Sequence, residues 1–180
     1  MFNLIDESFE IDDELRIRQL LDYNTSYLYI FDKSDDKYGY DIESYKYTVF
    51  PSGDYRKDFL GYIEVERSKQ WNTFDIPNNW YCISFLKRKV YEYDWSNNHF
   101  TDKAKFYNQT FYLKFNKDLT NCFTQSMEYI FTNGKDSKRN YKNGKLRGYN
   151  DQYIELKKHE VVFGIKESLS FIEGVFNESN

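Results

Sequence analysis

The sequence contains very little cysteine and histidine, and this scarcity excludes several classes of protein. Cys82 and Cys122 stand 40 positions apart without a CxxC pattern, so they indicate neither a disulfide framework nor a thiolate metal site. We expect both to be reduced core residues of a cytosolic protein. His99 and His159 are isolated from each other, which argues against a zinc site and against histidine-based acid–base catalysis.

Long apolar runs and glycine-rich loops are also missing. No stretch of 18 apolar residues is present, so we expect no membrane span and no membrane partner. The N-terminal stretch MFNLIDESFEIDDE is acidic and lacks the basic start and apolar core of a signal peptide. No phosphate-binding glycine loop and no GxSxG motif occur. We therefore expect a cytoplasmic protein, located in the host cytoplasm if its origin is viral.

Aromatic residues are abundant. The 180 residues include 18 Tyr and 16 Phe, and only 8 Gly and 2 Pro. Aromatic rings bury large areas, and disordered chains contain few of them, so the sequence predicts a folded core built largely from rings. Frequent Asn, Lys, Tyr, Ile and Phe are typical of an AT-rich genome, for which a phage or virus is one source.

Acidic and basic side chains are unevenly distributed along the chain. Residues 1–66 carry 16 acidic and 7 basic side chains, a balance of −9, while residues 67–180 carry 13 and 18, a balance of +5. The overall charge of −4 argues against a protein that only coats nucleic acid. The asymmetry is compatible with an acidic metal pocket beside a basic surface, and equally with scattered surface charge.

Hydrophobic periodicity predicts an early helix followed by strands. Residues 10–22 are expected to be helical, because their apolar residues fall near one face and acidic residues crowd the first turn. Runs of aromatic and β-branched residues predict strands at 25–31, 40–50, 60–68, 80–86 and 106–116. The nearly continuous apolar run at 80–86 is typical of a central strand.

In the second half of the chain the sequence pattern leaves the type of secondary structure open at several segments. Residues 117–131 form either a short helix or a strand, residues 153–165 form one or two strands, and residues 166–176 form a closing helix. Asn133-Gly134 and Asn143-Gly144 are typical of hairpin turns. Because no repeat or linker interrupts the chain, we expect one domain over residues 1–180, of α/β or α+β class.

Two glutamates share one face of the predicted strand at 60–68. Side chains of a strand alternate between faces, so Glu64 and Glu66 point the same way, roughly 6.5–7 Å apart, while Ile63 and Val65 point into the opposite, apolar face. Asp41 opens the preceding strand, and if the two strands form a hairpin it should lie near Glu66. Glu14, on the first helix, is a further carboxylate that could face the same pocket. Such oxygens are the ligands that Mg²⁺ prefers.

The ordered set of an acidic helix, Asp41 and Glu64-x-Glu66 resembles the PD-(D/E)XK nuclease superfamily over roughly residues 10–90. The resemblance implies a restriction-endonuclease-like fold, with a helix followed by a mixed, mostly antiparallel central sheet, and a nuclease-like core at about 10–165. It also implies a Mg²⁺ or Mn²⁺ cofactor held by Asp41, Glu64 and Glu66, hydrolysis of phosphodiester bonds, and DNA as the partner.

The sequence departs from the family pattern at one position. Glu66 stands where the family's Asp…Glu-x-Lys site has its lysine. Lys69, or the cluster Lys87-Arg88-Lys89, is expected to supply the missing positive charge at the catalytic site.

Basic residues suggest where nucleic acid would bind, although each has an alternative interpretation. Lys87, Arg88 and Lys89 follow the apolar strand at 80–86, and Lys138, Arg139 and Lys142 lie in a basic stretch with Tyr141. Such residues contact phosphates, but they also keep a strand end or a hairpin soluble. A second hypothesis is therefore a small, acidic, tyrosine-rich module that binds a protein partner without catalysis, as a phage or viral accessory factor, an inhibitor or a virion component.

Overall fold

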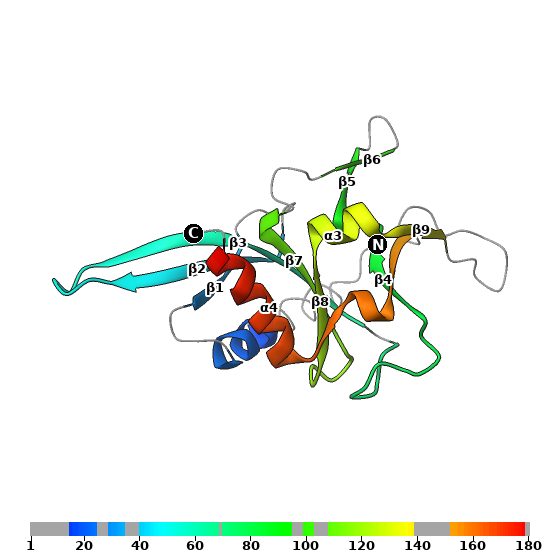
Figure 1. Ribbon diagram of the computed structural model, residues 1–180, viewed down its shortest axis with the longest axis horizontal. Coiled ribbons are helices and arrows are strands. Elements are labelled where there is room, and N and C mark those ends of the chain that lie inside the picture. The colour runs from blue at the N-terminus through cyan, green and yellow to red at the C-terminus, as the bar shows by residue number, and fades with distance from the viewer. Residues whose placement is uncertain are drawn as a thin grey trace, which may run out of the picture.

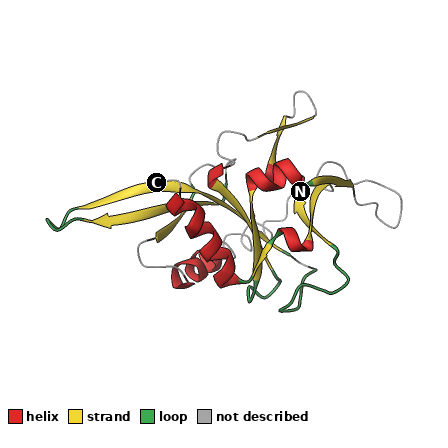
Figure 2. Ribbon diagram, viewed as in Figure 1, coloured by secondary structure: helices red, strands yellow, loops and turns green. Residues whose placement is uncertain are grey.

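The computed structural model describes residues 15–24, 29–34, 40–68, 70–94, 99–102, 108–138 and 152–178. These residues form an α+β fold with an N-terminal helix, a mixed sheet of six strands, a small second sheet and a C-terminal helix (Figures 1 and 2). The predicted α+β class, with a mixed and mostly antiparallel central sheet, is confirmed. Among the described residues, none of the helices combines the length and the apolar character that crossing a membrane requires.

The six-stranded sheet, which we call the large sheet, has the order β1-β2-β3-β7-β8-β11. Only β3 and β7 pair in parallel; the other neighbours are antiparallel. The strands are β1 (Tyr29–Lys33), β2 (Ile42–Val49), β3 (Tyr55–Arg67), β7 (Thr110–Phe115), β8 (Cys122–Ser126) and β11 (Val162–Phe163).

One face of the large sheet is covered by two helices. The N-terminal helix, described over residues 15–24, contributes Ile17 and Leu21, and α4 (Ile165–Glu178) contributes its apolar face. The ring of Phe111 on β7 meets the rings of Phe171 and Phe176 on α4 edge to face, with centroids 5.8 and 5.4 Å apart. Helix α4 confirms the helix predicted at 166–176.

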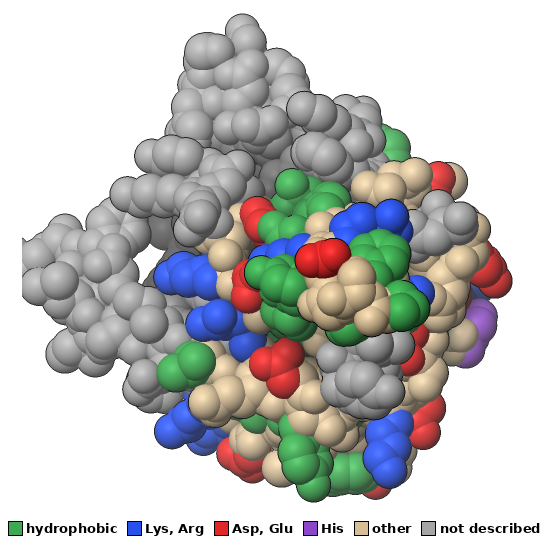
Figure 3. All heavy atoms as spheres, turned by 90° about the vertical axis from the view of Figure 1, so that its left-hand side faces the viewer, with side chains coloured by type: hydrophobic (Ala, Val, Ile, Leu, Met, Phe, Trp, Pro, Cys, Tyr) green, Lys and Arg blue, Asp and Glu red, His purple; other side chains and the backbone are tan. Residues whose placement is uncertain are grey.

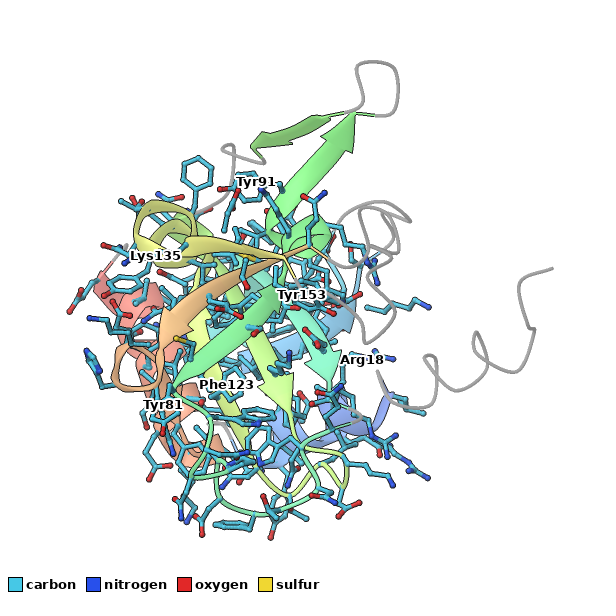
Figure 4. The ribbon with its side chains drawn as sticks, turned by 90° about the vertical axis from the view of Figure 1, so that its right-hand side faces the viewer. Arg18, Tyr81, Tyr91, Phe123, Lys135 and Tyr153 are labelled. Atoms are coloured by element: carbon cyan, nitrogen blue, oxygen red, sulfur yellow. The ribbon has the colours of Figure 1, made fainter. Side chains whose placement is uncertain are left out.

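The opposite face is covered by a small sheet, which stands in front of the large sheet in Figure 4. Its strand order is β4-β10-β9, and both pairings are antiparallel. The elements on this side are β4 (Cys82–Leu86), α2 (Lys87–Val90), α3 (Met127–Asn133), β9 (Lys135–Lys138), β10 (Gln152–Lys157) and η3 (Lys158–Glu160), and a separate two-stranded pair is formed by β5 (Tyr91–Asp94) and β6 (His99–Asp102). A second core lies between the two sheets, with Trp71, Phe85 and Phe123 at its centre.

Strands β2 and β3 continue beyond their neighbours as a two-stranded arm, at the left of Figure 1. Its turn is closed by hydrogen bonds from the Gly53 and Phe50 backbone N–H groups to the carbonyls of Phe50 and Asp54. Figure 3 looks at the molecule from the side of this arm and shows hydrophobic, acidic and basic side chains mixed together there. The exposed apolar side chains of the arm are Val49, Phe50, Tyr55 and Phe59.

Several local expectations require correction. The run at 80–86 does contain a strand, but β4 is an edge strand of the small sheet, and its side chains are buried because that sheet packs on the large one. Asn133-Gly134 is no hairpin turn, because α3 ends there and Gly134 N–H bonds to the Ile130 carbonyl. The stretch 117–131 contains both candidates, β8 and then the start of α3. The second predicted turn, Asn143-Gly144, lies outside the described residues.

The two cysteines occupy different environments. Cys122 is buried in the core, as expected, whereas Cys82 at the start of β4 is exposed, contrary to expectation. Burial raises the pKa of the Cys122 thiol to about 12, with a smaller opposing effect from its contact with Ser168. Since the thiolate is the reactive form, only Cys82 should react in the native protein.

Thiol labelling tests this difference. Native protein should react with one equivalent of an aromatic disulfide reagent, and denatured protein with two. The Cys82→Ser variant should show no fast labelling until it is unfolded. Rapid reaction of two thiols in the native wild type would contradict the burial of Cys122.

Removal of an aromatic ring tests the packing of α4 on the large sheet. Phe111→Ala should lower the free energy of unfolding by about 3–5 kcal/mol, because it leaves a cavity among the rings of α4. Phe74→Ala removes the same side chain from a position with 63% exposure and should change the free energy by less than about 0.5 kcal/mol. Denaturant unfolding followed by circular dichroism measures both; equal effects would contradict this packing.

Candidate functional site

The site lies at the N-terminal end of β2, where the pairing of β2 with β3 stops. The antiparallel register runs from Val49↔Tyr55 to Ile42↔Ile63, so the backbone of Val65 lies beyond the last pair. The carboxylate of Asp41 accepts the Val65 N–H at 2.8 Å and so takes the place of the missing strand. The backbone carbonyl of Val65 accepts a hydrogen bond from the Lys89 ammonium at 2.7 Å. The backbone of one residue of β3 therefore holds an acid and a base beside each other.

Lys89 binds three oxygen atoms at this point. Besides the Val65 carbonyl, its Nζ donates to Glu64 Oε1 in a short hydrogen bond and lies 3.4 Å from Asp41 Oδ2. Glu64 is buried, with 3% of its surface exposed. Lys89 comes from α2, a four-residue helix directly after β4. The small sheet therefore delivers the positive charge, and the large sheet delivers the oxygens.

A second ion pair lies one step along the same face. Glu66 Oε1 pairs with Lys114 Nζ at 2.8 Å, and Glu66 Oε2 accepts a short hydrogen bond from the Tyr112 hydroxyl. Lys114 also donates to the Ser84 carbonyl on β4 at 2.8 Å. The parallel register explains these partners, because Glu64 stands opposite Tyr112 and Glu66 opposite Lys114. We call Asp41, Glu64, Glu66, Lys89 and Lys114 together the carboxylate–lysine cluster.

The electrostatics of the cluster favour charged lysine and neutral tyrosine. Burial alone would lower the pKa of Lys89, but the nearby carboxylates of Glu64 and Asp41 outweigh it, and the pKa is raised. Burial and the Glu66 carboxylate raise the pKa of Tyr112 well above its usual value. Lys89 is therefore an ammonium and Tyr112 a hydrogen-bond donor across the physiological range.

The oxygens around Lys89 suit a hard divalent cation. Among the described residues, no three His, Cys, Asp or Glu side chains are grouped as metal ligands would be. What converges on a single point is two carboxylates, Asp41 and Glu64, and one carbonyl, Val65. Mg²⁺ prefers oxygen donors of these types and keeps several waters. The donor set fits Mg²⁺ or Mn²⁺ at the position that the Lys89 ammonium fills.

A pocket adjoins the second ion pair. Its volume is about 390 Å³, and Lys114 forms part of its wall together with Ser84 of β4. Polar and aromatic side chains line the remainder, namely Ser68, Gln70, Asn79, Trp80, Tyr81, Cys82, Phe123 and Glu155. Figure 4 shows Tyr81 and Phe123 at this end of the small sheet. Lys114 therefore links the carboxylates to an opening large enough for a small ligand.

The structure places Asp41, Glu64 and Glu66 on the large sheet, but not in the expected register. Asp41 directly precedes Ile42, whose partner on β3 is Ile63, so Asp41 lies beside Glu64 and Val65 rather than beside Glu66. The apolar face of Ile63 and Val65 packs against the two helices, as expected from the alternation.

The structure places the predicted basic residues in different environments. Lys89 enters the cluster, Lys87 pairs with Asp136 of β9 at 2.5 Å, and Arg88 is exposed between them. Lys138 ends β9, but its side chain is not described. The other predicted site residues, Glu14, Lys69, Arg139 and Lys142, lie outside the described residues.

Sequence reasoning missed Tyr112 and Lys114. The signal is present in β7, where TFYLKF is entirely buried and yet contains a lysine between Leu113 and Phe115. A buried lysine in an apolar strand needs an acidic partner. Only the parallel pairing of β7 with β3 identifies Glu66 as that partner, and the sequence does not reveal this pairing.

Comparisons with known proteins gave one structural likeness. No family model and no curated protein matches the sequence. A solved structure titled as that of D212, a nuclease from a fusselovirus, is similar with a TM-score of 0.38 and 14% sequence identity, covering 78% of this chain and 70% of that chain. A TM-score this low does not bear on what this chain does.

A double-mutant cycle tests the second ion pair. Lys114→Met should lower the free energy of unfolding by about 3–5 kcal/mol, because it leaves the Glu66 carboxylate buried without its ammonium. Adding Glu66→Gln should recover part of this loss, since the remaining side chains are neutral and Tyr112 can still donate. Denaturant unfolding of the wild type, both single variants and the double variant gives the coupling energy. Strictly additive effects would contradict the pairing.

Proposed function

We propose that this protein is a metal-dependent nuclease of PD-(D/E)XK type that hydrolyses DNA phosphodiester bonds. The observation that carries the proposal is the convergence of the Asp41 and Glu64 carboxylates and the Val65 carbonyl on the ammonium of Lys89. These oxygens come from the residue just before β2 and from the C-terminal part of β3, an order along the chain that the resemblance in sequence implies.

Asp41, Glu64 and the Val65 carbonyl would hold Mg²⁺ or Mn²⁺. When bound, such an ion lowers the pKa of a coordinated water and neutralises charge on a scissile phosphate. Asp41 is itself held by the Val65 N–H, which fixes Oδ2 of its carboxylate near the Lys89 ammonium. Glu66, the third predicted acid, has the separate task of holding Lys114 at the wall of the pocket.

Lys114 takes the role of the family's catalytic lysine in this proposal. Its ammonium is held by Glu66 and the Ser84 carbonyl on the same face as Glu64. It also borders the pocket, through which a phosphate would approach. A positive charge there stabilises the negative charge that develops on the phosphate oxygens. Exposed Arg88, next to Lys89, would contact a neighbouring phosphate of the DNA backbone.

Protein binding without catalysis is a second candidate function, favoured by the arm of β2 and β3. Four large apolar side chains of the arm are exposed, and basic and acidic groups are mixed beside them. Such a surface suits a protein partner better than a phosphate backbone. A wild-type protein that binds neither divalent ions nor DNA would favour this function.

Nicking of supercoiled plasmid tests the nuclease proposal. Wild-type protein with Mg²⁺ or Mn²⁺ should produce open circles, and a chelator should prevent this. Glu64→Gln should reduce the rate at least about a hundredfold, because it removes a charged ligand of the metal. The control Glu128→Gln makes the same change at an exposed position on α3 and should retain full activity. Equal nicking by the wild type and Glu64→Gln would reject the assignment.

A further inference from the structure

We propose that the Lys89 ammonium is a built-in substitute for the divalent ion, so that metal and Lys89 exclude each other from one position. Metal binding would then require Lys89 to leave the cluster. This inference rests on the proposed function, because it concerns the same site. It adds an internal competitor that sets how much metal the protein needs.

The geometry supports mutual exclusion. The ammonium of Lys89 contacts the two carboxylates and the carbonyl that form the metal donor set, all with the single atom Nζ. A magnesium ion lies about 2.0–2.1 Å from its oxygen ligands, closer than the 2.7 Å between Nζ and the Val65 carbonyl. Two cations do not fit among the same three oxygens.

The charges support exchange rather than addition. Asp41 and Glu64 together carry two negative charges, and Lys89 offsets one of them. A divalent ion offsets both, so the exchange leaves this part of the cluster neutral. Without any cation, two carboxylates would face each other in a largely buried place, which is unfavourable. The ammonium therefore keeps the site assembled until a metal arrives.

The position of Lys89 allows its ammonium to move from the carboxylates toward solvent. Its side chain is 17% exposed, and α2 is a single short turn whose next residue toward the N-terminus, Arg88, is exposed. A lysine has a flexible four-carbon stem with a compact charge at its end. A change of side-chain torsions brings the ammonium toward solvent while Val90 keeps α2 anchored in the second core.

Lys114 provides an internal contrast. Its ammonium contacts one carboxylate, Glu66, and one carbonyl, Ser84, and the other oxygen of Glu66 is taken by Tyr112. That environment offers one negative charge, which a single lysine matches. Of these two described positions, that of Lys89 combines two carboxylates, and there a divalent ion balances the charge better than the ammonium does.

Calorimetric titration with Mn²⁺ tests the inference directly. Lys89→Met should bind Mn²⁺ at least about tenfold more tightly than the wild type, because no ammonium has to be displaced. Lys87→Met is the matched control: it removes the same charge from the same helix, but its partner is Asp136. Its affinity should stay within about twofold of the wild type. Equal affinities for Lys89→Met and the wild type would overturn the inference.

A second measurement uses the unaltered protein. Amine-reactive labelling followed by peptide mass spectrometry should show Lys89 protected without metal and several-fold more reactive at saturating Mn²⁺. The Lys87 signal serves as the internal reference. Lys89 reactivity that does not change while the wild type binds Mn²⁺ would also overturn the inference, even if Lys89→Met failed to fold.

The nicking assay separates this inference from the proposed function. If the wild type nicks DNA and Lys89→Met binds Mn²⁺ with the same affinity as the wild type, the nuclease proposal stands and the competition by Lys89 is rejected. Tight Mn²⁺ binding by Lys89→Met alone, without nicking by the wild type, supports the competitor and rejects catalysis in the natural protein. No Mn²⁺ binding by the wild type or by folded Lys89→Met rejects both.

Discussion

The arrangement of the site depends on the backbone N–H and C=O of Val65, which lie beyond the N-terminal end of β2, where its pairing with β3 stops. A strand in mid-sheet needs partners for its N–H and C=O groups, and a buried group without one is costly. Here the Asp41 carboxylate takes the N–H and the Lys89 ammonium takes the carbonyl. A backbone requirement thus brings an acid and a base into contact, and the buried Glu64 carboxylate joins them. The site forms because β2 begins only at Ile42 and so leaves the Val65 backbone without a partner strand on that side.

Strict alternation along β3 keeps this polar cluster apart from the apolar core. Ile63 and Val65 face the helices, whereas Glu64 and Glu66 face the small sheet. Buried charges are tolerated only when they are paired and hydrogen-bonded, and here each carboxylate meets an ammonium. The pairs also join the two layers, since Lys89 and the Ser84 carbonyl come from the side of the small sheet. The cluster therefore serves the fold as well as any chemistry.

The sequence was informative wherever a feature is local. Alternation identified the two faces of β3, and the pattern of 166–176 identified α4. Non-local features were not accessible. The register that sets Asp41 beside Glu64 rather than Glu66 depends on two strands, and the parallel pairing of β3 with β7 joins segments about 48 residues apart. The burial of β4 has the same origin: an apolar run predicts that a strand is covered, but not whether neighbouring strands or a second sheet cover it.

The departure at Glu66 shows how a position in a motif and a position in space can separate. The PD-(D/E)XK pattern that the sequence resembles has a lysine there, on the same strand as the glutamate. In this chain the acidic Glu66 stands opposite Lys114 in the parallel register. The neighbouring strand β7 therefore places a positive charge on the same face of the sheet as Glu66. Glu66 on β3 and Lys114 on β7 therefore act as one pair in physical terms. Either alone would leave a buried charge without its ionic partner, and together they keep an ammonium on the same face of the large sheet as Glu64.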